Sequence, residues 1–159
     1  MEIKLLKISD FQNDFNLLLE ECYNCYLSIW QNELVFNNKP IIRNKNLDKE
    51  KEQDFWGIVE GHSNHMVFEG LLRYETLPIL KYILQEVSKT TNNDFEDIIW
   101  FYSERRRVNI LSKKLKYLII LHECEKINRF ITAFPVNEIK VQKIKYKWQT
   151  YWQNQYPHE

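Results

Sequence analysis

Long apolar runs are missing from this 159-residue sequence. The longest unbroken runs of apolar side chains are about five residues, whereas a helix needs about 20 to cross a bilayer. The first residues also lack the pattern of a secretory signal peptide. We therefore expect a soluble, cytoplasmic protein with no membrane partner.

Cysteine is scarce as well, with only Cys22, Cys25 and Cys124. The first two form a CxxC pair, but a redox pair of this spacing usually sits at a helix N-terminus, and this one falls inside a helical pattern. A zinc site would need a second pair of ligands, for which only His62 and His65 are suitably spaced. The alternative is that Cys22 and Cys25 share one helix face as small buried side chains. We expect neither a metal nor another cofactor.

Apolar and aromatic residues supply enough material for one hydrophobic core. Hydrophobic residues make up 44% of the chain, with five Trp, nine Tyr and nine Phe, so disorder is expected only at the ends and in residues 37–51. A chain of this length suits one compact unit. Within it, residues 1–50 are predicted to form an N-terminal helical extension.

The net charge of zero conceals a division along the chain. Residues 1–104 hold 10 basic and 18 acidic side chains, and residues 105–159 hold 12 basic and 4 acidic ones, so the two parts carry −8 and +8. The basic part includes Arg105, Arg106 and Arg107, which would attract a polyanion. Alternatively, the two parts neutralise each other within one globule.

Apolar residues spaced three and four apart predict three helices. The first covers residues 9–37, with Ser9 as N-cap and Gln12 completing a capping box. The second follows Thr76 as N-cap, with Pro78 in its first turn, and ends within residues 88–93. The third follows Asn137 and ends near Gln153.

The remaining apolar segments predict strands, at residues 2–7, 40–43, 98–103, 108–111, 117–121 and 129–134. The last two form an antiparallel hairpin, in which Phe130, Thr132 and Phe134 are expected to share one face. Residues 44–53 read as a charged connector or a short helix. The predicted fold class is therefore α+β, a central antiparallel sheet with N-terminal, middle and C-terminal helices packed on it.

Residues 54–65 concentrate two glycines, Gly57 and Gly61, and the two neighbouring histidines, His62 and His65. Glycine gathered in this way indicates unusual backbone torsions or close approach. We expect a loop here, and loops often carry functional side chains. With Glu60, the histidines would offer the ligands of a metal-dependent nuclease, the least favoured of the functions considered.

Several segments together resemble the prophage-encoded branch of the barnase, EndoU, colicin and RelE superfamily of small endoribonucleases. They are FW-I at 55–58, R-x-E at 73–75, the LPILKYIL helix, the basic strand end at 104–107, and YLIIL followed by TAFPV. The resemblance covers about residues 54–152 and excludes residues 1–50. It implies that residues 51–159 form a nuclease domain, with helices on an antiparallel sheet and toxin-like RNA cleavage that needs no metal.

The resemblance also implies roles for individual residues. Arg73, just before the middle helix, would hold the phosphate, and Glu75 would orient it or accept a proton. Tyr117 and Thr132 would donate hydrogen bonds from adjacent strands. The expected RNA-binding side chains are those of the basic strand end and its neighbour, Arg105, Arg106, Arg107 and Lys116. A cognate inhibitor is a further expected partner.

The chain departs from the family pattern at two positions. Relatives have a histidine where this chain has Gly57, and often an arginine where it has Thr76. Histidine suits proton transfer near neutral pH because its ordinary pKa is about 6.5. Three explanations stay open: His62 or His65 has taken over, the residue was changed to inactivate a toxic enzyme, or the protein is a non-catalytic interaction protein on the same scaffold.

Overall fold

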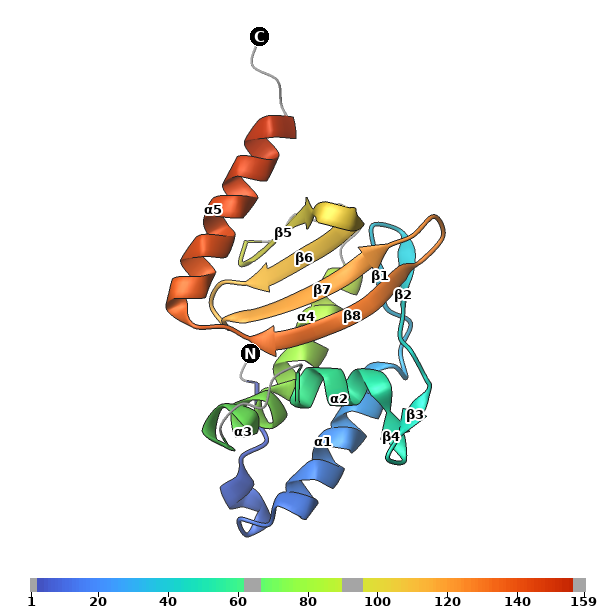
Figure 1. Ribbon diagram of the computed structural model, residues 1–159, viewed down its shortest axis with the longest axis vertical. Coiled ribbons are helices and arrows are strands. Elements are labelled where there is room, and N and C mark those ends of the chain that lie inside the picture. Colours follow the sequence, from blue (N-terminus) through green and yellow to red (C-terminus); the bar gives the residue numbers. More distant parts are fainter. Residues whose placement is uncertain (1–2, 62–66, 90–95, 156–159) are drawn as a thin grey trace.

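The computed structural model describes residues 3–61, 67–89 and 96–155. Within these ranges the chain forms five α-helices, two 3-10 helices and eight strands (Figure 1). In chain order they are η1 (Ile8–Phe11), α1 (Phe15–Ile29), β1 (Val35–Phe36), β2 (Lys39–Ile42), β3 (Leu47–Asp48), β4 (Lys51–Glu52), α2 (Gln53–Val59), α3 (Val67–Glu75), α4 (Leu77–Lys89), β5 (Ile98–Ser103), η2 (Glu104–Arg106), β6 (Arg107–Ser112), β7 (Tyr117–Glu123), β8 (Asn128–Pro135) and α5 (Glu138–Gln155).

The main sheet has six strands in the order β1-β2-β8-β7-β6-β5. Strands β5 to β8 form an antiparallel meander, and β2 adds to β8 in parallel. The predicted α+β class is therefore confirmed, with one parallel pair added to the antiparallel sheet. Strand β2 pairs with the first two residues of β8, and among the described residues no strand pairs with the rest of β8 on that side, so it forms an edge of the sheet.

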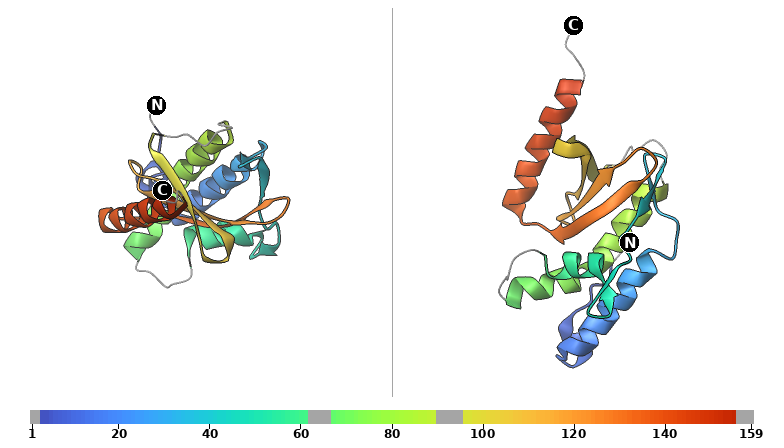
Figure 2. Two further views of the ribbon diagram at one scale, coloured as in Figure 1. Left: turned by 90° about the horizontal axis from the view of Figure 1, so that it is seen from above. Right: turned by 45° about the vertical axis from the view of Figure 1, so that its right-hand side comes forward.

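Two hydrophobic cores lie on the two faces of this sheet. Helices α1, α2 and α4 pack against the first face around Tyr26, Phe55, Ile119 and Phe130, which we call the lower core. Helix α5 packs against the second face around Leu111 and other apolar residues, which we call the upper core. Figures 1 and 2 show the sheet between α5 and the group α1–α4. Each face is buried by helices far apart in the sequence.

The start of the chain differs from the prediction. Residues 3–7 form no strand, and the predicted long helix divides into η1 and α1. Gln12 and Asn13 lie between them with φ of 58° and 56°, a left-handed conformation that cannot continue a right-handed helix. The N-cap of α1 is Asp14, whose side chain accepts the backbone N–H of Asn16 at 2.9 Å, and not Ser9.

Residues 37–51, where we expected disorder or a connector, form short hairpins. Asn37 and Asn38 occupy the two-residue turn between β1 and β2, and Lys49 and Glu50 the turn between β3 and β4. All four have positive φ. A two-residue hairpin loop with positive φ at both positions is the preferred turn for twisted strands.

The middle of the chain is more helical than predicted. Gly57 lies inside α2, and Arg73 lies in the last turn of α3, so the prediction that Arg73 precedes a helix N-terminus is wrong. Thr76 separates α3 from α4, and its hydroxyl donates to the carbonyl of Leu72 at 2.6 Å. The final helix begins as predicted, because the Asn137 side chain accepts the backbone N–H of Lys140 at 2.9 Å.

None of the helices in the described ranges is both long and apolar enough to span a bilayer.

Candidate functional site

A row of polar side chains crosses the second face of the sheet, beyond the residues that pack against α5. Directly paired residues of neighbouring strands lie on the same face. The pairs Ser103–Arg107, Arg107–His122 and His122–Arg129 therefore line up four side chains from β5 to β8. Arg129 is exposed, and Arg107 and His122 are half-buried. We call Arg107, His122 and Arg129 the basic row, in which two guanidinium groups flank one imidazole.

A second row, with polar residues at its two ends, runs beside the basic row on the same face. Asn109 pairs with Ile120, and Ile120 pairs with Thr132. The Asn109 side-chain amide donates to the Ser103 hydroxyl at 2.9 Å, which joins the two rows. Thr132 is half-buried, so its hydroxyl lies next to the basic row without being sealed in a core.

A β-bulge in β8 decides which way Thr132 faces. Consecutive residues of β7 pair with Phe130 and Thr132, which leaves Ile131 without a partner. Phe130 packs in the lower core, whereas Phe134 packs in the upper core. The prediction that Phe130, Thr132 and Phe134 share a face is therefore wrong, because the extra residue resets the alternation of the strand.

Arg73 reaches the same edge of β8 from α3. Its Nη1 donates to the carbonyl of Ile58 in α2 at 3.2 Å, and its guanidinium carbon lies 5.3 Å from the ring centroid of Phe134. Phe134 is two residues from Thr132 on the same face of β8. The described contacts therefore bring Arg73 to the strand that carries Thr132.

Gly61 makes room for the Arg73 side chain. Its φ is +67°, and a Cβ atom there would come within 2.9 Å of Nη1 of Arg73. The expectation of unusual torsion and close approach is confirmed at Gly61. It is not met at Gly57, which is helical and, in the part of the chain that the structure describes, has no atom outside its own helix within 4 Å of where a Cβ would be.

Helix α2 lines this edge of the sheet. Burial raises the pKa of the Asp54 carboxyl in this helix. The hydrogen bond that this carboxyl accepts from the backbone N–H of Asn44, at 2.8 Å, and the positive charge of Arg129 each lower the pKa in part. Further along α2, Ile58 accepts the hydrogen bond from Arg73. Gly57 lies on the stretch between these two contacts, with space for a larger side chain.

Glu75 does not join Arg73. Its carboxylate accepts the backbone N–H of Ile8 at 3.0 Å, and its own carbonyl accepts the N–H of Leu6. Two residues apart on a helix, Arg73 and Glu75 point in nearly opposite directions. The structure thus contradicts the predicted phosphate-orienting role, since Glu75 anchors the segment that precedes α1.

Tyr117 is also separated from Thr132. It is fully buried in the lower core, on the face of the sheet opposite to Thr132, and its hydroxyl has no hydrogen-bond partner within the described chain. Burial raises the pKa of Tyr117, partly offset by the charge of Arg73. The prediction that Tyr117 and Thr132 donate hydrogen bonds to the substrate from adjacent strands therefore fails for Tyr117, whose side chain lies on the opposite face of the sheet.

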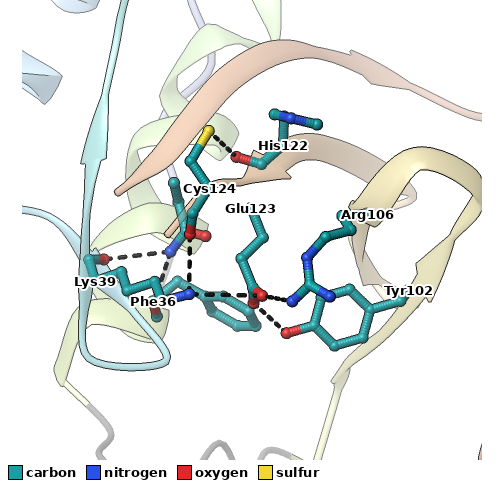
Figure 3. Close-up of polar contacts among 8 residues, drawn as sticks. Phe36, Lys39, Tyr102, Arg106, His122, Glu123 and Cys124 are labelled. Atoms are coloured by element: carbon teal, nitrogen blue, oxygen red, sulfur yellow. Dashed lines mark hydrogen bonds and ion pairs between the residues drawn. The ribbon is translucent and has the colours of Figure 1, made fainter. Parts of the chain in front are cut away.

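The three predicted RNA-binding arginines fall in different environments. Arg105 is exposed in η2, Arg107 belongs to the basic row, and Arg106 is bound to Glu123. Glu123 also accepts the hydroxyl of Tyr102. Figure 3 shows this carboxylate with Arg106 and Tyr102 on one side and Lys39 on the other, and with the His122 side chain pointing away from it.

Lys116 lies apart from the basic row. It occupies the turn before β7, whereas His122 is near the other end of that strand. Its Nζ pairs with the Glu138 carboxylate at 3.3 Å. The prediction that Lys116 works beside the arginines is therefore not supported by its position.

The cysteine pair has the character of core residues. Cys22 is buried and its thiol donates to the Tyr74 carbonyl at 3.2 Å. Burial raises the pKa of Cys22 to about 12 and of Cys25 to about 11, which suppresses thiolate formation. In the described ranges, no three Cys, His, Asp or Glu side chains are grouped to hold a metal. His62 and His65 lie outside the described residues.

Sequence reasoning missed His122, Arg129, Asn109 and Asp54. His122 follows from the strand alternation, because it continues the pattern of β7 two residues past Ile120, whereas the face of Arg129 depends on the bulge in β8. The predicted strand ended at Leu121, one residue short of the histidine. Asn109 and Asp54 carry no such local signal, since their positions depend on strand register and on the packing of α2.

Compared with known proteins, the chain matches no family model, no curated protein and no solved structure.

Proposed function

We propose that this protein is a toxin-like endoribonuclease that cleaves RNA without a metal. The observation that carries the proposal is the basic row, in which His122 lies between Arg107 and Arg129 with Thr132 in the adjacent row. The site would be open to a substrate, because Arg129 is exposed and the other three side chains are half-buried.

The reaction needs a base, an acid and cations around the phosphate. The substrate 2′-oxygen attacks phosphorus and loses its proton to the base, while the bond to the 5′-oxygen breaks and that oxygen receives a proton. The products are a 2′,3′-cyclic phosphate and a 5′-hydroxyl. In this proposal His122 exchanges the protons, and Arg107 and Arg129 balance the charge that grows on the phosphate.

The buried Nδ1 of His122 has no hydrogen-bond partner in the ranges described, so in this proposal the imidazole meets the substrate through Nε2. Thr132 would donate a hydrogen bond to a phosphate oxygen, and Arg73 would bind a neighbouring phosphate from the edge of β8.

The family resemblance supports the same location for the proposed catalytic site. Its segments at 55–58, 73–75 and 132–136 are far apart in sequence, yet α2 packs against β8 and Arg73 contacts both Ile58 of α2 and Phe134 of β8. At Gly57, the position of the family histidine, an added Cβ would meet no described atom outside its own helix within 4 Å. In this proposal His122 takes the place of that histidine. RNA as substrate, a cognate inhibitor as partner and a cytoplasmic location belong to the same proposal.

Incubation with total RNA in EDTA tests this function. We expect fragments with cyclic phosphate ends, a loss of roughly 10²- to 10⁴-fold in rate for His122→Ala, and faster cleavage by Gly57→His. Lys116→Ala, at the other end of β7, serves as the control variant and should cut like the wild type. Intact RNA with both the wild type and Gly57→His would contradict the proposal.

The second candidate is a non-catalytic interaction protein, favoured by one observation: Gly57 gives α2 no titratable side chain at the family position. It predicts that the wild type binds RNA or a protein partner without cutting RNA, while Gly57→His cuts. It also predicts partner binding that survives Arg73→Ala combined with Thr132→Ala.

A further inference from the structure

An open pocket of about 820 Å³ lies between the end of β5 and the C-terminal half of α5. Figure 1 shows α5 rising beside β5 at this end of the sheet. The indole of Trp152 donates to the backbone carbonyl of Trp100 at 2.7 Å, which fixes the helix against the edge strand. The pocket therefore lies between two elements, β5 and α5, whose relative position this hydrogen bond helps to fix.

The walls of the pocket combine aromatic rings with hydrogen-bonding groups. Tyr151 contributes a ring 6.1 Å from that of Tyr102, and Tyr146 stands at the rim with 70% of its surface exposed. Thr150 and Asn154, one helical turn apart, add a hydroxyl and an amide on the same wall. Exposed tyrosine rings beside such groups are the usual means of holding an unpaired base.

The pocket is continuous with the proposed phosphate-binding site. Ser103 lines the pocket and is paired with Arg107, the first member of the basic row. The Arg106 guanidinium carbon lies 5.6 Å from the ring centroid of Tyr102, another pocket residue. A strand of RNA whose phosphate rests on the basic row would therefore have an aromatic pocket next to it.

One charge in the pocket favours a base over a phosphate. Glu104 lines it, and a carboxylate repels a phosphate but accepts hydrogen bonds from the exocyclic amino group of a base. Lys147 lies on the opposite wall and would meet the backbone of the same nucleotide.

We propose that this pocket binds a nucleobase of single-stranded RNA, stacked on Tyr146 and Tyr151, when the adjacent phosphate occupies the basic row. The proposal rests on the proposed function in one respect, that RNA is the ligand. It requires no cleavage, so it holds equally for a protein that binds RNA without cutting it.

The test compares two probes with the same number of phosphates. One is a mixed-sequence 2′-O-methyl RNA 12-mer, which lacks the nucleophilic hydroxyl, and the other is the same backbone without bases. Affinities are measured for the wild type, Tyr146→Ala and Tyr146→Phe. Ile139→Ala is the matched control, since Ile139 is a 69% exposed side chain on the same helix outside the pocket.

We expect Tyr146→Ala to weaken binding of the base-bearing probe by about fivefold or more, the effect of one lost stacking contact, and to leave the abasic probe unchanged. Tyr146→Phe and Ile139→Ala should behave like the wild type. Equal losses for both probes, or no loss for either, would overturn the pocket proposal alone. A wild type that binds neither probe would overturn it together with the proposed function.

Discussion

Arg106 and Glu123 form an ion pair that joins the β5–β6 turn to the end of β7. The Glu123 side chain is buried on the lower face of the sheet, where it also accepts the Tyr102 hydroxyl and lies 3.5 Å from Nζ of Lys39. The turn that it holds places both Arg105 and Arg106 in the left-handed conformation, at φ of 60° and 56°. The left-handed conformation costs roughly 1–2 kcal/mol for each residue other than glycine. We therefore infer that the ion pair helps to keep the turn in this shape.

Glu123→Gln should therefore destabilise the protein. It removes a buried charge that serves Arg106, Tyr102 and Lys39 together, and the loss of a charged hydrogen-bond acceptor costs about 1–3 kcal/mol. Urea denaturation measures the change in unfolding free energy. Glu125→Gln, at an exposed position of the next turn, is the control and should stay within about 0.5 kcal/mol of the wild type. Equal effects of the two substitutions would show that Glu123 is not an anchor.

Gly61→Ala and Gly57→Ala should have opposite effects on stability. At Gly61 the added Cβ meets Nη1 of Arg73 at 2.9 Å and the backbone is left-handed, so we expect a loss of about 1–2 kcal/mol. At Gly57 the Cβ meets nothing within 4 Å inside a helix, so alanine should add roughly 0.5–1 kcal/mol. Thermal or urea unfolding of the pair decides this, and a stabilised Gly61→Ala would refute the packing described around Arg73.

The basic row should govern the salt dependence of RNA binding. Each arginine that contacts a phosphate contributes about 0.7 to the slope of log Kd against log salt for single strands. Arg107→Ala and Arg129→Ala should each lower the slope by about this amount for the 2′-O-methyl probe. Lys116→Ala should leave it unchanged, because Lys116 is paired with Glu138 at the other end of β7. An identical slope in all four proteins would remove the basic row from the interface.

The cysteine pair of α1 should make the stability of the protein fall at high pH. Burial raises the pKa of Cys22 to about 12 and of Cys25 to about 11, from their ordinary value of 9.0. The contribution of the two thiols to stability is fully present below pH 9.0, where the folded and the unfolded chain both keep the thiol protons. This contribution to the free energy of unfolding is lost as the pH rises towards the folded-state pKa values, because the unfolded chain releases its thiol protons first. The loss is up to about 1.4 kcal/mol per pH unit for each thiol.

Urea denaturation at a series of pH values from 8 upwards, in the presence of a reductant, measures this dependence. The double variant Cys22→Ala and Cys25→Ala should lose stability less steeply than the wild type above pH 9.0. Equal slopes would mean that other groups, such as Tyr74, whose pKa burial raises to about 12, account for the whole effect.

Local sequence patterns were enough to predict the strands whose residues on at least one face are apolar. Strand β5 was predicted with its observed bounds, and β7 was found because apolar residues fill both faces in its first half. The end of β7 was missed because His122 is polar and pairs with Arg107 and Arg129 instead of entering a core. The local pattern thus failed at a residue that we place in the proposed site.

The α+β class, the C-terminal helix capped by Asn137 and the basic character of residues 105–159 followed from the sequence alone, because they depend on composition and on neighbours a few residues apart. The tertiary structure decided the rest. Strand register brought Arg107, His122 and Arg129 into one row, the bulge at Ile131 turned Thr132 to their face, and packing placed Glu75 and Tyr117 elsewhere. These outcomes depend on contacts between residues distant in sequence, and a single sequence carries no local signal for such contacts.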